Sequence, residues 1–388
     1  MEILFVSHKF PPAVGGMEKQ SFELITGMEH FCKVHRIVYD GKGSILSFFL
    51  GLRKRILQTC KDHPGITVIH FNDALLATMC LWHTGYEHLK RTVTLHGLDV
   101  VFPSEIYRKR IFPKFNKLDL FIAVSRATAD QAVALGIDSA KVTVIKNGVD
   151  YEHANSVSTE IPKVLAKYGI PADRRLLVAV GRPVRRKGFS WFIREVVPKL
   201  DPRFFVLLIG PFDDKPGFFE RLLALVPNKL RGQVMLFLGF GSDAAAIRSL
   251  LNNPIFGRSA KHLGRLPAAD KQALLEGSDA FIMPNIHVDG DMEGFGLVCL
   301  EAVTAGALVY AANIDGIPDA IQDGKNGFLL PSQNAEIWAK ELNKLLLPNQ
   351  NLHERKRDFL EFTISHYGWD KMVKAYYNAF MDLMRHEN

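Results

Sequence analysis

Cysteines are scarce in this sequence of 388 residues, and the four that it has, Cys32, Cys60, Cys80 and Cys299, are scattered. None has C-x-x-C spacing, which argues against a structural zinc site and against a disulfide framework. No uninterrupted apolar run approaches the ~18 residues of a membrane-spanning helix. The opening run MEILFVSHKF is so short that we expect a first strand there, not a secretion signal. We therefore expect a cytoplasmic protein.

Short-period repeats and low-complexity tracts are also missing, which disfavours solenoids and disordered arrays. The composition, with 47% hydrophobic and 23% charged residues, is ordinary for a soluble globular protein. The chain is too long for one core and fits two domains of usual size.

Acidic residues are underrepresented in the first part of the chain, and the net charge is +7. Residues 1–150 hold 19 Lys and Arg against 14 Asp and Glu, whereas the remainder holds 29 against 27. Two basic clusters, RKRILQTCK (53–61) and YRKRIFPKFNK (107–117), suit contact with an anionic membrane surface. The alternative is a solvated helix face with a few buried aromatics. Nucleic acid is disfavoured because no known binding module accompanies the charge.

Short apolar runs alternate with helical patterns along both halves, which indicates parallel sheets covered by helices on both faces. A polar stretch at 149–175, with Pro162 and Pro171, separates the halves as the expected linker. We expect an α/β protein with two doubly wound domains facing each other across a cleft. The predicted strands are 2–8, 33–40, 67–72, 92–97, 120–125, 141–148, 176–181, 204–210, 234–240, 279–284 and 307–312.

The run from 279 to 312 carries the first candidate site. It is predicted to form a strand, a loop over 285–296, a helix over 297–305 stopped by Gly306, and the next parallel strand. The backbone N–H groups at the helix start attract anions, so Gly294, Phe295, Gly296 and Leu297 are candidates to hold a phosphate.

Glu293 and Glu301 flank this helix start. If both lay on one helix they would be about 12 Å apart, beyond the roughly 5–9.5 Å of paired glycosidase carboxylates. The spacing favours two grips on one extended sugar ligand over an acid–base pair on one bond. Two solvated acids, one of them a helix-capping charge, are the alternative.

Three further sites follow predicted strands. Gly15 and Gly16 open a helix near Met17, where bare N–H groups suit a phosphate. Arg182 and Lys187, in GRPVRRKGF (181–189), suit the developing charge of a diphosphate leaving group, or else form a solvated basic turn. We expect Arg185 and Arg186 to face water. His96, in TLHGLD, ends the strand at 92–97, where a structural histidine is the alternative.

In their order along the chain these residues resemble the retaining glycosyltransferases of family 4, which have the GT-B fold of two Rossmann-like domains. The matching segments are PPAVGGME, TLHGLD, AVSRAT, KVTVIKNGVD, GRPVRRKG, HLGRL, EGFGLVCLEA and GIPDAIQDGKNGFLL.

The resemblance implies an acceptor-side domain at 1–160, a nucleotide-sugar domain at 161–370 and a helix at 371–388 that crosses back to the first domain. It assigns Glu293 to the hydroxyls of the donor sugar, Glu301 to the ribose, and Arg182 with Lys187 to the diphosphate. Gly16 and the backbone at 294–297 would assist. The stretch from Gly264 to Leu266 would face the base, and His96 would lie near the donor sugar and the acceptor.

The implied reaction moves a sugar from a nucleotide to a hydroxyl of a glycan or glycolipid. We favour a UDP-sugar over GDP-mannose, cell-surface polysaccharide or lipopolysaccharide synthesis, and same-face attack in which the departing diphosphate takes the acceptor proton. No metal or other cofactor is expected, and Asp289 and Asp291 are interpreted as loop charges. We expect a peripheral enzyme at the inner face of the cytoplasmic membrane.

Some residues depart from the family pattern. Asp315-Gly316 stands where a glycine pair is usual, Asp319 replaces a common glutamate, and 304–311 lacks a proline. The segment 211–232 has no assigned role. Two alternatives stay open: a dinucleotide-dependent oxidoreductase, because GFGSDA (239–244) fits G-x-G-x-x-A, and a non-catalytic GT-B scaffold.

Overall fold

The computed structural model describes residues 1–151, 160–212, 243–348 and 351–385. It divides into two compact units. Unit 1 comprises residues 1–149, 292–297 and 366–388, and unit 2 comprises residues 150–291 and 298–365. Within the described ranges, no helix combines the length and the apolar character that a membrane-spanning segment needs.

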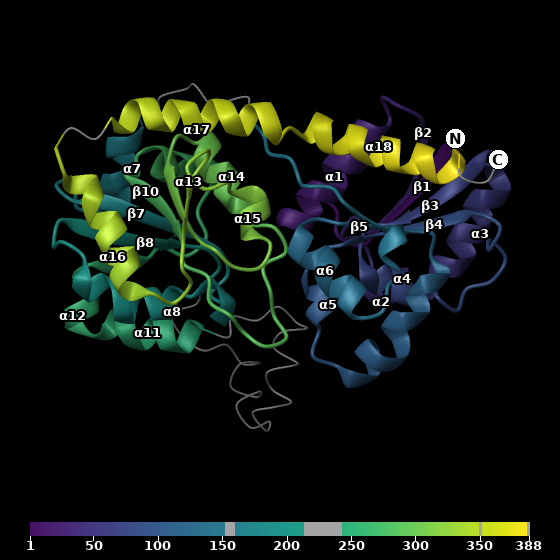
Figure 1. Ribbon diagram of the computed structural model, residues 1–388, viewed down its shortest axis with the longest axis horizontal. Coiled ribbons are helices and arrows are strands. Elements are labelled where there is room, and N and C mark those ends of the chain that lie inside the picture. Colours follow the sequence, from purple (N-terminus) through teal and green to yellow (C-terminus); the bar gives the residue numbers. More distant parts are fainter. Residues whose placement is uncertain (152–159, 213–242, 349–350, 386–388) are drawn as a thin grey trace. The chain divides into compact units, whose positions relative to one another are not determined.

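Unit 1 is built on a six-stranded parallel sheet with the order β2-β1-β3-β4-β5-β6 (Figure 1). Its strands are β1 (Glu2–Ser7), β2 (Lys33–Val38), β3 (Ile66–Phe71), β4 (Lys90–Leu95), β5 (Leu120–Ala123) and β6 (Val142–Val144). Its helices are α1 (Gly16–Met28), α2 (Ile45–Leu50), α3 (Leu52–Asp62), α4 (Ala74–Cys80), α5 (Leu98–Val101), α6 (Arg126–Ala134) and α18 (Trp369–Arg385).

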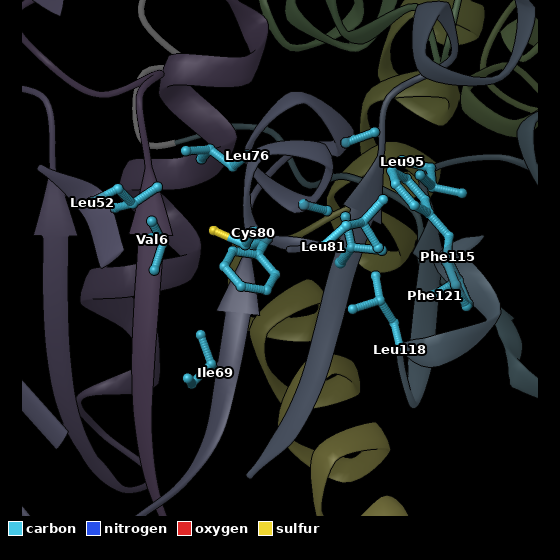
Figure 2. Close-up of a cluster of buried hydrophobic side chains, with 14 of the residues drawn as sticks. Val6, Leu52, Ile69, Leu76, Cys80, Leu81, Leu95, Phe115, Leu118 and Phe121 are labelled. Atoms are coloured by element: carbon cyan, nitrogen blue, oxygen red, sulfur yellow. The ribbon is translucent and has the colours of Figure 1, made fainter. Parts of the chain in front are cut away.

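The alternation of side chains along β1 explains why both faces of this sheet are covered. Leu4 and Val6 point into a core with α2, α3 and α4, part of which Figure 2 shows. Ile3 and Phe5 point to the opposite face, into a core with α1 and α18. All four side chains are fully buried, and such burial stabilises the fold by about 1.5–3 kcal/mol for each large side chain.

Helix α18 is fixed to the unit 1 sheet by buried polar contacts as well as by apolar ones. The Tyr376 hydroxyl lies 3.0 Å from Thr94 Oγ1 and accepts a hydrogen bond from Gln20 Nε2 at 3.3 Å. His70 Nε2 lies 3.0 Å from Thr94 Oγ1, and its Nδ1 lies 2.7 Å from Thr92 Oγ1. Burial lowers the pKa of His70 to about 3, so the ring is neutral and each nitrogen has a partner.

Unit 2 has a second six-stranded parallel sheet, with the order β12-β11-β10-β7-β8-β9. Its strands are β7 (Arg175–Val180), β8 (Phe204–Ile209), β9 (Ala260–His262), β10 (Ala280–Met283), β11 (Leu308–Ala312) and β12 (Phe328–Leu330). Its helices are α7 (Ile161–Lys167), α8 (Phe189–Trp191), α11 (Ala244–Asn252), α12 (Pro254–Gly257), α13 (Ala268–Glu276), α14 (Leu297–Thr304), α15 (Ile317–Ala320), α16 (Ala335–Asn343) and α17 (Leu352–His366). The first residue of α14, Leu297, and the last residue of α17, His366, belong to unit 1.

The predicted class, α/β with two doubly wound parallel sheets, is confirmed. Every predicted strand within the described residues is a strand, whereas 234–240, the unassigned segment 213–232 and most of GFGSDA lie outside them. Two strands were not predicted, β9 and β12. Both have only three residues and lie at the edges of the unit 2 sheet, where less burial leaves no long apolar run in the sequence.

The strand orders show between which two strands the direction of winding reverses in each sheet. In unit 1 the order reverses between β1 and β3, and in unit 2 between β7 and β10. In doubly wound sheets ligands bind beyond the carboxyl ends of the strands at this reversal. The loops after β1, β3, β7 and β10 are therefore the places to look for a site.

Candidate functional site

The loop after β7 presents Arg182 and Lys187 in different surroundings. Arg182 is exposed, whereas Lys187 is only 7% exposed. The stem of Lys187 lies along Gly181, since a Cβ on that glycine would be 3.3 Å from Lys187 Cε. A cation held this far from water interacts more strongly with an anion than a solvated one does.

Gly188 fixes this loop against the end of β10. Its φ of 65° is left-handed, and a Cβ there would overlap the carbonyl oxygen of Pro284. No other residue type fits both constraints. The loops after the two central strands of unit 2 are therefore in direct backbone contact.

A buried ion pair makes a second link between these two loops. Arg186 Nη1 lies 3.1 Å and 3.2 Å from the two carboxylate oxygens of Asp291, and the side chains are 14% and 7% exposed. The backbone N–H of Ile286 also donates to Arg186 O at 2.9 Å. The expectation that Arg186 faces water is therefore wrong, because its side chain is largely buried against Asp291, which is a loop charge as expected but a buried and paired one. Arg185 and Asp289 are exposed as expected.

Glu301 lies on α14 and forms an ion pair with Lys271 on α13. The distance from Lys271 Nζ to Glu301 Oε2 is 3.1 Å, and the side chains are 33% and 38% exposed. An ion pair this exposed is worth about 1 kcal/mol or less, so the carboxylate can exchange Lys271 for another hydrogen-bond donor. Lys271 was not identified from the sequence, where it is one of many surface lysines.

The stretch from Gly264 to Leu266 follows β9 and is tied to the end of β8. Gly264 has a φ of 71°, and its carbonyl accepts a hydrogen bond from Gly210 N at 2.9 Å. Its own N–H donates to His262 Nδ1 at 3.0 Å. The His262 ring stacks on Phe212 with 4.0 Å between centroids, and burial lowers the pKa of His262 to about 4. Leu266 is half-buried.

In unit 1 the structure brings His96, Gly16 and the segment 292–297 together. A Cβ on Gly294 would overlap the carbonyl oxygen of His96, and a Cβ on Gly16 would lie 3.7 Å from Leu297 Cδ2. Phe295 is buried, whereas Glu293 and Leu297 are half-buried. Gly296 has a left-handed φ of 89°. Close backbone approach is thus required at Gly294 but not at Gly16.

Gly15 is the N-terminal cap of α1, in line with the predicted helix start. Its φ of 171° is extended backbone that any residue adopts. A Cβ there would meet only the flexible end of the Glu18 side chain. Gly15 is therefore not required by the fold itself.

His96 is oriented by its neighbours at the carboxyl edge of the unit 1 sheet. Its Nε2 lies 2.7 Å from the carbonyl oxygen of Asn72, and its backbone N–H donates to Asp99 Oδ2 at 2.6 Å. A carbonyl only accepts, so Nε2 donates a proton in this contact, which fixes the orientation of the ring. Burial raises the pKa of the Asp99 carboxyl.

A second buried pair lies at the same edge. His8, after β1, has its Nδ1 2.9 Å from Oδ2 of Asp73, which follows β3, and the side chains are 9% and 2% exposed. Burial raises the pKa of Asp73, but His8, the backbone N–H of Leu76 and His96 together outweigh burial and hold the pKa below its usual value. Sequence analysis missed this pair, although the motifs SH and ND directly after two strands were available as a signal.

No metal site is evident in the described ranges, where no group of three or more His, Cys, Asp or Glu is placed to hold an ion.

Asp315, which stands where the family pattern usually has glycine, has a backbone conformation that explains why aspartate is tolerated there. Asp315 has a φ of 54°, which is the left-handed region that glycine adopts without strain and aspartate tolerates. Asp315 therefore adopts a backbone conformation that a glycine would also adopt.

Proteins of known sequence and structure resemble this chain over both units. A putative colanic acid biosynthesis glycosyltransferase of Salmonella typhimurium is 25% identical over 71% of this chain, and the match spans 60% of that relative's length. The crystal structure of Anabaena HepE with UDP-glucose superimposes with a TM-score of 0.72 at 18% identity, covering 98% of this chain and 100% of that one. The apo lipopolysaccharide outer core galactosyltransferase WaaB gives a TM-score of 0.64 at 16% identity, covering 98% and 99%.

Two family models match the chain. The model for Glycosyltransferase Family 4 matches residues 12–153, and the model for glycosyl transferases group 1 matches residues 160–359. The second match alone covers more than half of the 388 residues. The chain therefore belongs to the group 1 glycosyltransferases of family 4 and has the GT-B fold.

Proposed function

We propose that this glycosyltransferase moves a hexose from a UDP-sugar to a hydroxyl of a glycan or lipid-linked glycan, with retention of the anomeric configuration. The observation that carries the proposal is the loop after β7. It holds one buried and one exposed cation at the strand reversal of unit 2, where a diphosphate is the expected ligand.

Charge neutralisation is the main contribution to the rate in this proposal. As the bond from the anomeric carbon to the diphosphate breaks, negative charge grows on the leaving oxygen. Lys187 and Arg182 stabilise that charge together with the backbone amides at 294–297 and Gly16, and they are oriented before the reaction starts. The leaving oxygen takes the proton of the acceptor hydroxyl, which attacks from the same face, so no carboxylate nucleophile and no metal ion is needed.

The other predicted residues recognise the donor. Glu301, oriented by Lys271 at 3.1 Å, accepts hydrogen bonds from the ribose hydroxyls, and Glu293 accepts them from the sugar. The Gly264–Leu266 stretch faces the base. His96 lies near the donor sugar and the acceptor, where Nδ1 of its ring contacts a sugar hydroxyl.

Relatives support the substrate classes. HepE is crystallised with UDP-glucose, which favours UDP over GDP-mannose. Colanic acid and lipopolysaccharide core appear in the names of relatives, which favours an acceptor in cell-surface polysaccharide or lipopolysaccharide synthesis. Such acceptors are membrane-bound, and with the basic first half of the chain they favour a peripheral enzyme at the inner face of the cytoplasmic membrane.

Thermal unfolding with a panel of nucleotides tests the donor. A ligand that binds only the folded state, at a hundred times its Kd, stabilises it by about 2.7 kcal/mol. We expect UDP-sugars to raise the Tm, and GDP-mannose and NAD not to. Lys187→Met keeps the stem and removes the charge, so it should weaken UDP binding by roughly 10- to 100-fold. Arg185→Met, an exposed arginine of the same turn, is the matched control.

Three results would count against the proposal. Stabilisation by NAD but by no UDP-sugar would point to an oxidoreductase. Equal weakening by both variants would show that Lys187 has no special role. Glu293→Ala with full transfer activity would remove that residue from the donor site.

A further inference from the structure

One surface of unit 1 combines exposed apolar side chains with basic ones. Helix α2 is anchored by Phe48, which is only 6% exposed. Phe49 is half-buried against the same core, whereas Ile45, Leu46 and Leu50 are 45%, 63% and 76% exposed. Leaving three such side chains in water on one six-residue helix is unfavourable, and exposed apolar clusters mark interaction sites.

The next helix supplies the positive charge. Arg53, Lys54 and Lys61 of α3 are exposed, and no Asp or Glu occurs from residue 41 to residue 61. With Leu50, Leu57 and Gln58 these residues line a surface hollow of about 470 Å³. Helices α2 and α3, labelled in Figure 1, contribute Phe48, Leu52 and Ile56 to the same buried core as α4, so the surface lies directly over that core.

Contacts of Arg53 and Lys114 extend this surface to a tryptophan. Arg53 Nη2 donates to Thr84 O at 3.0 Å and to Thr84 Oγ1 at 2.9 Å. Two residues earlier, Trp82 is 58% exposed, and Lys114 Nζ lies 5.4 Å from the centre of its ring. We name the whole surface the α2–α3 patch, formed by Ile45, Leu46, Leu50, Arg53, Lys54, Leu57, Lys61, Trp82 and Lys114.

The second basic cluster predicted from the sequence has a different character. Phe112 and Phe115 are fully buried in the unit 1 core, so the alternative of buried aromatics is correct there. Lys109 forms an ion pair with Glu105 at 3.1 Å. Lys114 of this cluster belongs to the α2–α3 patch, but Phe112 and Phe115 are not at the surface and Tyr107 is half-buried.

An anionic lipid surface matches the α2–α3 patch better than a protein does. Leucines and a tryptophan among basic residues form the pattern of interfacial helices, in which apolar groups enter the headgroup region and cations meet phosphates. A protein partner would need acidic groups placed opposite each cation, whereas an anionic bilayer presents them everywhere. We propose that the α2–α3 patch docks this enzyme on a membrane rich in anionic lipid.

The proposal rests on the peripheral membrane location proposed above and names the surface that makes the contact, but its test uses neither donor nor acceptor. Either proposal can therefore fail alone. The protein is mixed with phosphatidylcholine vesicles, with and without phosphatidylglycerol, and the fraction that floats with the vesicles is measured. We expect flotation only with phosphatidylglycerol, and less of it as salt is raised.

Two double variants address the two components of the patch. Leu46→Ser with Leu50→Ser should lower vesicle affinity at least tenfold, and Arg53→Gln with Lys54→Gln by roughly fivefold for each charge. Ile255→Ser with Leu347→Ser is the matched apolar control, because these unit 2 side chains are 73% and 55% exposed. Lys163→Gln with Arg194→Gln is the charge control, with side chains 75% and 55% exposed.

Several outcomes would overturn the proposal. One is an equal loss of flotation in the patch variants and the control variants. Another is flotation with pure phosphatidylcholine vesicles that equals flotation with vesicles containing phosphatidylglycerol. A dimer in light scattering that Leu46→Ser with Leu50→Ser dissociates would assign the patch to a second copy of the chain. If the leucine variant unfolds at a lower temperature than the unmodified protein, the flotation of Arg53→Gln with Lys54→Gln decides whether the patch binds the membrane.

Discussion

Removing the carboxylate of Asp291 tests how the loop that carries Lys187 is held. Arg186 and Asp291 are 3.1 Å apart and 14% and 7% exposed. At an effective dielectric constant of about 20, unit charges about 3 Å apart attract each other by roughly 5 kcal/mol. Asp291→Ala removes this attraction but not the desolvation of Arg186. We expect the free energy of unfolding to fall by about 3 kcal/mol, the lower end for a broken buried pair, because Arg186 keeps some solvent.

Urea unfolding followed by tryptophan fluorescence measures this loss, since Trp191 and Trp338 both lie in unit 2. Asp289→Ala is the matched control. Asp289 is two residues away and fully exposed, so its loss should change stability by less than about 0.5 kcal/mol. Arg186→Met with Asp291→Leu should recover most of the stability, because an apolar pair replaces the ionic one. Equal effects of Asp291→Ala and Asp289→Ala would refute the reasoning.

Two further predictions concern the backbone and pH. Gly188→Ala and Gly306→Ala both place a side chain at a left-handed φ, 65° and 85°, which costs about 1–2 kcal/mol of folding free energy in each case. Only in Gly188→Ala does the new Cβ also overlap the carbonyl oxygen of Pro284. The first should therefore lower the urea midpoint clearly more than the second, and similar midpoints would contradict the close contact of the two loops. His70 is held neutral because burial lowers its pKa to about 3, so the unfolded chain binds the proton first as pH falls below about 6.5. This should remove about 2 kcal/mol of stability by pH 5. His70→Gln should reduce the difference between urea midpoints at pH 7 and pH 5, and an unchanged difference would contradict it.

The parts of this fold that sequence analysis predicted are those specified by local patterns. Buried strands such as β10 and β11 show as apolar runs, and the helix expected at 297–305 is α14, Leu297–Thr304. The helix expected near Met17 begins at Gly16. Strands β9 and β12 were missed because their three residues carry no comparable pattern, and their place is set by the neighbouring strands.

The predicted site residues were identified by strand ends and glycines, but their partners were not. Arg186 and Asp291 are 105 positions apart, and Lys271 and Glu301 are 30 apart. The pairing of His8 with Asp73 likewise depends on β1 and β3 being neighbours in the sheet. Such pairs depend on the packing of whole loops against each other. The sequence around Arg186 and around Asp291 therefore predicts only two ordinary surface charges.

The most direct test of the central claim follows the anomeric configuration of the transferred sugar by proton NMR. The reaction is run with the UDP-α-sugar that the unfolding panel selects, a membrane-extracted glycan acceptor and a metal chelator. The account predicts that the new linkage keeps the α configuration and forms at an undiminished rate with chelator present. A β-linked product, or transfer that the chelator abolishes, would contradict it.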